Sequence, residues 1–371
     1  MPTDLTPHTV STATAETRAT IADVARLAGV SKATVSRFLN HRDTLLSPGI
    51  AARVEAAVTE LGYVPSPMAQ ALKRGRSRLI GLVVADISNP FSVAVLRGAE
   101  KACQEAGYLV MLFNLGNDGA REREGIEALA SYQVEGFILN TLGTDPKAAD
   151  EVARHGKPAV LVDRKHPEMQ ADFVSLDNAD AMRLAVDHLL ERGYRELLYV
   201  TEATAGVSSR QEREAAFRAH LSGYAAAHTD VGDLAASARV VESSDAHGAD
   251  LHAHLEALRS LGKAGPAAVI ASNAVTTLRV ATACAALGWT LGHELGFVGF
   301  DDTEWAPLVG PGLTTIAQPT DDIGRVAASC LLDHLQGRKL PPRQILLPGR
   351  LVARGSSQAV AAEPAGVITS A

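Results

Sequence analysis

Short polar side chains follow several of the apolar runs in this sequence. Asp86, Asn140, Asp163, Asn273 and Asp301 each stand at the end of a run rich in Val, Ile, Leu or Ala. In an open sheet of parallel strands, ligands bind at the carboxyl ends of the strands, where such side chains would meet. Carboxylate and amide groups of this size suit the recognition of hydroxyls. Asp and Asn are also routine helix caps, which is the alternative for each of them.

Two arginines lie near the start of an expected helix further along the chain. Arg210 and Arg213 are one turn apart and follow Ser208 and Ser209, which can cap the helix. Positive charge is unfavourable at a helix N-terminus, so a purely structural role explains the pair poorly. Two guanidiniums at this spacing suit a bidentate grip on a carboxylate or a phosphate.

A short helix expected over residues 31–40 has one apolar side and one polar side. The outward residues are Lys32, Ala33, Ser36 and Arg37, and the inward residues are Val35, Phe38 and Leu39. An arginine able to pair with a base, a lysine, and a small side chain able to contact a thymine methyl suit the major groove of DNA. A solvated helix face is the alternative.

The segment 65–78 is basic and contains one apolar residue, Leu72, beside the cations at positions 73, 74, 76 and 78. Only residues 67–73 could be helical before Gly75, which is too short for a helix that is stable in water on its own. A leucine wedged into a minor-groove step, with cations beside it, would kink DNA and stabilise such a helix. An ordinary basic linker is the alternative.

Three short helices are expected between residues 20 and 61. Apolar spacing predicts the first over 20–27, Gly29 suits the left-handed turn after it, and Ser31 can cap the second. The third ends at Gly62. Two helices joined by a tight turn and followed by a packing helix form the helix-turn-helix pattern.

Beyond residue 79, β-rich apolar runs alternate with helical stretches, which is typical of parallel sheets with helices on both faces. Roughly 280 residues exceed one hydrophobic core, so two such subdomains facing each other across a cleft are expected. The expected strands are 79–86, 109–114, 136–141, 159–163, 197–201, 267–272 and 296–301, and the helices include 91–106, 119–132, 178–192, 208–221, 274–287 and 321–335.

Composition and charge exclude several classes of protein. The 371 residues are 46% hydrophobic with a net charge of −7, and no apolar run approaches the length of a membrane span. Residues 1–78 carry ten Lys/Arg against six Asp/Glu, so a basic head precedes an acidic body and only the head should meet a polyanion. The Ser/Thr-rich N-terminus lacks the apolar core of a secretory signal, so the protein is expected to be cytoplasmic.

Signals of an enzyme or of a metal site are missing. The chain has no GxGxxG, Walker A, GxSxG or HExxH motif and no visible nucleophile–base pair. His252 and His254 would point to different faces of a helix. Cys103, Cys284 and Cys330 are far apart, so neither disulfides nor a cysteine-zinc site is expected. No catalytic residue, cofactor or metal is therefore predicted.

These features resemble the lactose/galactose-repressor (LacI) family of transcriptional regulators over nearly everything from Thr20 to about Gly355. The matching segments are 20–25, 28–31, 34–37, 62–63, 69–73, 80–81, 299–302 and 313–316. The resemblance implies an all-α helix-turn-helix head plus an α/β periplasmic-binding-protein-like body of two parallel-sheet subdomains around a cleft.

The resemblance also implies a homodimer that binds a pseudo-palindromic double-stranded DNA operator. The recognition helix would be 31–39, and Leu72 would take the place of the family's minor-groove leucine. The implied DNA-contacting residues are Thr20, Ser31, Lys32, Ala33, Thr34, Ser36, Arg37, Asn40, Ala69, Leu72 and Lys73.

A small-molecule effector would bind in the cleft. Carried over, the family's site falls on Asp163, Arg213, Asn273, Asp301 and Gln318, with Phe91 packing on the ligand, and Asp86 and Arg210 complete the expected effector set. Segments 162–165, 209–213 and 301–306 resemble the branch that responds to sugar acids such as 2-ketogluconate and 2-keto-3-deoxygluconate. Paired arginines agree with an anionic effector.

The expected function is a DNA-binding transcriptional regulator, acting as a repressor, whose operator binding a sugar acid controls. The alternative is a regulator of the same type that responds to a neutral sugar or a nucleobase. A more distant alternative is a sugar-binding protein without a DNA role. The family's C-terminal tetramer-forming heptads are absent, so a dimer is expected.

The expected domains follow from these assignments. They are a disordered tail (1–18), a helix-turn-helix domain (19–66), a hinge helix and linker (67–78), an effector-binding and dimerisation domain (79–357) and a second disordered tail (358–371). Within the large domain, the first subdomain would comprise about 79–175 and 319–343, and the second about 176–316 and 345–357.

Overall fold

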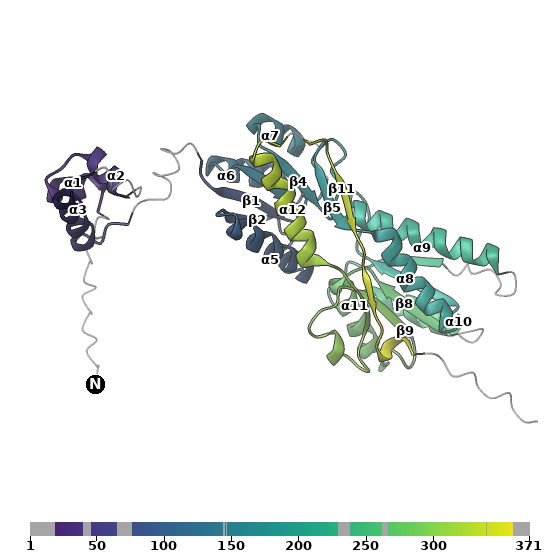
Figure 1. Cartoon of the computed structure of the whole chain (residues 1–371). Helices are drawn as coiled ribbons and strands as arrows, with labels where there is room; N and C mark the ends of the chain where they lie inside the picture. The colour runs from purple at the N-terminus through teal and green to yellow at the C-terminus, as the bar shows by residue number, and fades with distance from the viewer. Residues whose placement is uncertain are drawn as a thin grey trace, which may run out of the picture. The chain divides into compact units, whose positions relative to one another are not determined.

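The computed structural model describes residues 19–39, 46–64, 76–143, 145, 147–228, 238–261, 266–338 and 340–358. They form two units that divide between Ser77 and Arg78, and each unit is considered by itself (Figure 1). All of the expected tail 1–18, residues 359–371 of the second expected tail and residues 67–75 of the expected hinge lie outside the described residues. None of the helices in these ranges has the length and apolar character that a membrane crossing needs.

The small unit contains three helices around one apolar core. They are α1 (Ile21–Ala28), α2 (Lys32–Leu39) and α3 (Pro48–Glu60). Val24, Val35 and Val54, one from each helix, are completely buried against one another. Gly29 ends α1 with φ +62°, a left-handed conformation that glycine adopts without strain. The helix-turn-helix predicted from the sequence is therefore present.

The first subdomain of the large unit is a six-stranded parallel sheet in the order β11-β5-β4-β3-β1-β2. Its strands are β1 (Leu79–Val84), β2 (Leu109–Asn114), β3 (Gly136–Leu139), β4 (Ala159–Val162), β5 (Asp172–Leu176) and β11 (Gln344–Leu347). Helices α5 (Pro90–Glu105) and α12 (Thr320–Leu335) cover one face. Helices α6 (Arg121–Ser131) and α7 (Lys147–His155) cover the other.

The second subdomain repeats this arrangement with the order β12-β10-β9-β8-β6-β7, in which only β12 is antiparallel to its neighbour. Its strands are β6 (Glu196–Thr201), β7 (Ala238–Glu242), β8 (Ala267–Ala271), β9 (Gly296–Phe300), β10 (Thr314–Ala317) and β12 (Arg350–Val352). Helices α8 (Asn178–Glu191) and α9 (Ser208–Ala227) cover one face, and α10 (His252–Leu261) and α11 (Ala274–Ala286) the other.

Three short segments connect the two sheets, between β5 and α8, between β10 and α12, and between β11 and β12. They pack together: a Cβ on Gly349 would lie 3.1 Å from Ile316 Cγ2 and 3.3 Å from Leu176 Cδ1. In Figure 1 the yellow run through β11 and β12 passes from the first sheet to the second. Because β11 pairs with β5, residues 345–347 belong to the first subdomain and not, as expected, to the second.

Several elements escaped the search for apolar runs. Strands β5, β7, β10, β11 and β12 and helices α7 and α10 were not among those expected. In β10 the reason is buried polar residues: Thr314 Oγ1 donates to Arg354 O (3.0 Å), and Thr315 Oγ1 donates to Asp302 Oδ1 (2.8 Å). A hydrogen-bonded hydroxyl can be buried in a strand, but it interrupts the apolar pattern. Gln358, expected in the C-terminal tail, accepts a hydrogen bond from Tyr194 Oη (3.0 Å) and belongs to the body.

Helices α5 and α12 approach each other backbone to backbone at two glycines. A Cβ on Gly98 would lie 2.1 Å from Asp321 O, and a Cβ on Gly324 would lie 2.1 Å from Val95 O. Gly98→Ala and Gly324→Ala should each lower the unfolding free energy, at the upper end of the roughly 1–3 kcal/mol typical of overpacking. Urea unfolding followed by circular dichroism measures this loss.

Gly223→Ala in α9 is the matched control, because nothing lies within 4 Å of its added Cβ. It should raise the unfolding free energy by about 0.5–1 kcal/mol through helix propensity. Equal effects of all three substitutions would contradict the close approach of α5 and α12.

Candidate functional site

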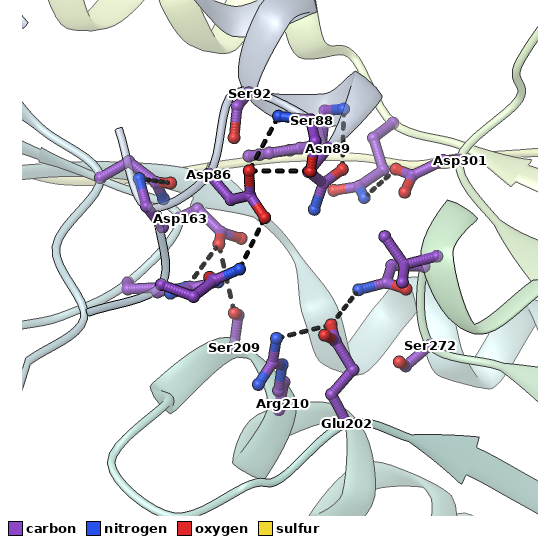
Figure 2. A pocket seen from close by; sticks show the side chains of 18 of the residues that line it. Asp86, Ser88, Asn89, Ser92, Asp163, Glu202, Ser209, Arg210, Ser272 and Asp301 are labelled. Carbon is purple, nitrogen blue, oxygen red and sulfur yellow. Dashed lines mark hydrogen bonds and ion pairs between the residues drawn. The ribbon is translucent and has the colours of Figure 1, made fainter. Parts of the chain in front are cut away.

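A cavity of about 240 Å³ lies where the carboxyl ends of the strands of both sheets meet. Figure 2 shows labelled side chains from both subdomains around its open centre, with Asp86 and Asp163 from the first and Glu202, Arg210 and Asp301 from the second. All eight residues of the expected effector set line this cavity: Asp86, Phe91, Asp163, Arg210, Arg213, Asn273, Asp301 and Gln318. The binding of a ligand to them stays a prediction.

Asp163 and Asp301 occupy equivalent positions in the two sheets, because β4 and β9 are each third in their strand order. Both have a left-handed backbone, with φ +65° and +75°. Non-glycine residues adopt this conformation at a cost of about 1–3 kcal/mol, and such strain is concentrated at functional sites. Each amide donates to the neighbouring strand, to Val174 O and to Ile316 O (3.0 Å each), and these bonds hold the strained turn in place.

The carboxylate of Asp301 is enclosed and hydrogen-bonded. It accepts from the backbone N–H of Ala274 (2.9 Å) and from Gln318 Nε2 (2.6 Å). Burial raises the pKa of Asp301, against the opposing influence of the Arg213 guanidinium. Ala274, which follows Asn273, has no polar side chain, and it contributes its backbone N–H to the carboxylate of Asp301.

Arg213 lies almost completely buried under the cavity. Its Nε donates to Asn178 Oδ1 (2.8 Å), Nη1 to Ser272 O (2.6 Å) and Nη2 to Gln318 Oε1 (3.3 Å). The guanidinium also stacks 4.4 Å from the centre of the Phe300 ring.

Arg210 points to a different set of partners. Its Nη2 donates to Glu202 Oε2 (2.6 Å) and its Nη1 to Ala203 O (2.8 Å). Asn273 Nδ2 donates to the same carboxylate oxygen (2.7 Å). The interpretation of Arg210 and Arg213 as a pair that lacks a structural explanation is therefore corrected, because protein groups satisfy both guanidiniums in different directions.

The first subdomain contributes a polar loop and an aromatic ring to the cavity. Asp86 accepts hydrogen bonds from Ser88 N (2.8 Å) and from Asn117 Nδ2 (2.6 Å). Phe91 is 8% exposed and packs between the cavity and the apolar core under α5. Asp163 Oδ2 accepts from Ser209 Oγ (3.3 Å), which connects the two subdomains.

Sequence reasoning missed three charged residues of the cavity wall: Arg164, Glu202 and Arg279. Glu202 directly follows β6, as Asp163 follows β4, so the strand-end rule could have found it. Arg164 is adjacent to the candidate residue Asp163. Its burial distinguishes it from an ordinary surface arginine, and the sequence does not show burial. Arg279 lies inside α11, and only the fold brings it to the cavity.

The second candidate site is the outer face of α2. Lys32, Ala33 and Arg37 are exposed, whereas Val35 is buried and Phe38 and Leu39 pack against the core, as predicted. Ser31 Oγ accepts a hydrogen bond from Thr34 N (3.2 Å), which caps the helix. Thr20 is exposed and Ser36 half-buried, while Asn40, Ala69, Leu72 and Lys73 lie outside the described residues.

The cysteines, and the histidines of the described ranges, are the side chains to consider for a metal site. Cys103 and Cys330 lie in the core between the first sheet and α5 and α12. In the described part of the chain, no three His, Cys, Asp or Glu side chains gather as metal ligands would.

Comparison with known proteins connects both sites to one group of proteins. A family model described as bacterial regulatory proteins, lacI family, matches residues 20–66, and one described as a periplasmic binding protein-like domain matches residues 186–357. The chain is 46% identical over 343 residues to the HTH-type transcriptional regulator PtxS of Pseudomonas plecoglossicida, covering 92% of this chain and 97% of that protein. It is 37% identical over 337 residues to the HTH-type transcriptional regulator KdgR of Bacillus subtilis (strain 168), covering 91% and 97%.

Solved structures agree with these sequence relatives. The lac repressor dimer bound to operator and the anti-inducer ONPF is similar with a TM-score of 0.75 and 25% identity, covering 92% of this chain and 100% of that chain. The complex of the transcriptional regulator CelR with cellobiose has a TM-score of 0.64 and 28% identity, covering 91% and 100%.

The buried carboxyl of Asp301 makes stability depend on pH. Since its pKa is raised in the folded protein, the unfolded chain releases this proton first, near pH 4, and the unfolding free energy falls as the pH rises above that value. Asp301→Asn removes this dependence while its Oδ1 can still accept from Ala274 N. The unfolding free energy of the variant, relative to the parent, should therefore increase from about pH 4 upward.

Asp250→Asn provides a control of opposite sign. Burial raises the pKa of Asp250, but hydrogen bonds from Ser244 N, Asp245 N and Ser243 Oγ outweigh it and lower that pKa overall. This variant should lose stability relative to the parent as the pH rises towards about 4. Thermal unfolding between pH 2.5 and 7 measures both, and parallel profiles would contradict the assignment for Asp301.

Proposed function

The chain belongs to the LacI family of bacterial regulatory proteins and is a DNA-binding transcriptional regulator rather than an enzyme, and from that premise we propose that a sugar acid controls its binding to operator DNA. Compounds such as 2-ketogluconate and 2-keto-3-deoxygluconate have the chemistry we propose for the effector. The regulator would act in the cytoplasm as a repressor.

The composition of the cavity wall carries this proposal. Carboxylates and amides that suit hydroxyl groups stand beside four guanidiniums, those of Arg164, Arg210, Arg213 and Arg279. A neutral sugar needs hydroxyl partners alone, whereas an acid also needs a cation, and guanidinium matches a carboxylate with paired hydrogen bonds. The resemblance of segments 162–165, 209–213 and 301–306 to the branch that responds to sugar acids supports the same ligand class.

We further propose that the chain binds a pseudo-palindromic operator as a homodimer. The lac repressor, to which the fold is similar, is a dimer on its operator. The exposed face of α2, with Lys32 and Arg37, would enter the major groove, and the positive charge of residues 1–78 would neutralise phosphates.

The effector would act by shifting a population between two arrangements of the subdomains. In the described arrangement the loop after β4 contacts the start of α9: Lys165 Nζ lies 2.7 Å from Glu212 Oε1, and Lys165 N donates to Ser208 Oγ (2.8 Å). A ligand that touches both sheets favours one arrangement over another. That preference would reach the DNA-binding heads through the linker at residues 67–78.

Arg37 provides a test of the DNA-binding face. If it reads a base through paired hydrogen bonds, Arg37→Ala should weaken operator binding by about 1–3 kcal/mol and leave binding to random DNA little changed. Fluorescence anisotropy with an operator selected from random duplexes measures both. Equal losses on the two DNAs would make Arg37 a phosphate contact only.

The effector proposal is tested with the full-length protein on that operator. 2-Ketogluconate or 2-keto-3-deoxygluconate should change operator affinity at least about tenfold, a coupling of roughly 1.4 kcal/mol. Fructose and adenine serve as the neutral sugar and nucleobase. A response to one of these, and none to the acids, would overturn the sugar-acid effector and leave the DNA-binding function intact.

A further inference from the structure

The joint between the linker and the body, at Arg78, has a strained backbone. Arg78 is the first residue of the large unit, ends the expected linker (67–78) and directly precedes β1. Its φ of +55° is left-handed. Glycine adopts this conformation freely, but a residue with a Cβ keeps it only where its surroundings hold it in place.

The chain segments that lead into the two strands beside β1 hold Arg78 from both sides. On the side of β3, Arg78 N donates to Glu135 Oε1 (2.7 Å), and Glu135 N donates to Leu79 O (2.7 Å). On the side of β2, Arg78 O accepts from Leu109 N (2.9 Å), and Arg78 Nη1 donates to Gly107 O (3.4 Å). Rotation of the backbone at Arg78 would break hydrogen bonds on both sides.

Tyr108 connects the two sides of this arrangement. Its Oη donates to Glu135 Oε2 (3.5 Å), and the centre of its ring lies 5.8 Å from the guanidinium carbon of Arg78. Glu135 and Tyr108 are half-buried, whereas the side chain of Arg78 is exposed. Together, Arg78, Glu135 and Tyr108 form the joint clamp, in which the short bond from Arg78 N to Glu135 is the main contact.

The other non-glycine residues with a left-handed backbone, among the described residues, lie at the cavity or at a helix end. Asn117, Asp163 and Asp301 line the cavity. Gln133 follows α6, and helices commonly end in this conformation. Arg78 lies in neither place, because it begins a strand at the amino edge of the first sheet, away from the carboxyl ends that form the cavity. The strain at Arg78 thus coincides with the joint between the two units.

We propose that the joint clamp pre-organises the chain for operator binding, because it fixes the direction in which the linker leaves the body. Binding to a defined operator fixes the position of the helix-turn-helix unit. A joint that is already ordered loses no conformational entropy in that step, whereas a free joint does. Random DNA attracts the basic residues by charge and does not require one fixed position. This inference rests on the proposed operator binding and is independent of the sugar-acid effector.

Glu135 provides a test in which charge and pre-organisation have opposite effects. Glu135→Ala removes a negative charge, which by itself would strengthen binding to DNA. Loss of the clamp should instead weaken operator binding about five- to thirtyfold, the change that corresponds to ordering the backbone of one residue. Glu135→Gln keeps an oxygen that can accept from Arg78 N and should bind the operator at least as tightly as the parent. Fluorescence anisotropy of the full-length protein with the selected operator and with random DNA measures both variants.

A matched pair of substitutions at Arg78 separates its backbone conformation from its charge. Arg78→Asn and Arg78→Val both remove the cation, but asparagine tolerates a left-handed backbone and a β-branched residue does not. Arg78→Asn should bind the operator within about threefold of the parent, and Arg78→Val should bind it as weakly as Glu135→Ala. Gln133→Val is the control, because it disturbs another left-handed residue of the first subdomain and should leave operator affinity unchanged.

The outcomes separate this inference from the proposed function. Operator affinity of Glu135→Ala at or above that of the parent would overturn the joint clamp, as would equal losses in Arg78→Asn and Arg78→Val. Equal losses on operator and random DNA would do the same. Should Glu135→Ala fail to fold, as urea unfolding would show, the pair at Arg78 decides. Failure of the parent to select any operator from random duplexes would overturn operator binding itself, and the clamp's role with it.

Discussion

The buried guanidinium of Arg213 is the point at which separate segments of the body meet. It donates to Asn178 beside the first connection between the sheets, to Gln318 within the second, and to the carbonyl of Ser272 after β8. A buried charge that loses such partners costs several kcal/mol, so these segments are held together as a set. Arg213, Ser272 and Gln318 also line the cavity, so the cavity wall includes groups that connect the two subdomains.

The second constraint is the repetition of one topology in two sheets that share no visible sequence repeat. Parallel strands bring their carboxyl ends to one edge, and two such edges facing each other create a cavity lined from both sides. Asp163 and Asp301, third in each sheet, are strained in the same way. That equivalence places one carboxylate on each wall, which suits a ligand with hydroxyls along its length.

The cationic side chains of the two candidate sites stand in different environments. Lys32 and Arg37 are exposed on α2, where water and salt screen their charge. Strong binding of a polyanion to such a surface requires contacts with many phosphates. Arg164 and Arg213 are buried, where screening is weak and each hydrogen bond to an anion counts for more. Arginine thus stands in two environments, exposed on α2 in the head and buried in the cavity wall of the body.

The sequence by itself indicated the helix-turn-helix, the seven strands with the strongest apolar runs, and eight of the residues that line one cavity. The helices, the strands and six of these residues follow from local rules, namely apolar period, caps, helical spacing and polar residues at strand ends, whereas Phe91 and Gln318 were expected only from the resemblance to the LacI family. Strands with buried hydroxyls, such as β10 with Thr314 and Thr315, were invisible to those rules because their partners lie far away in the chain. Only the tertiary structure decided which arginine is satisfied, because Glu202 occupies Arg210 while Arg164 keeps unused donors. Hydrogen bonding of a buried charge depends on what the fold places around it, and no residue pattern along the chain records that.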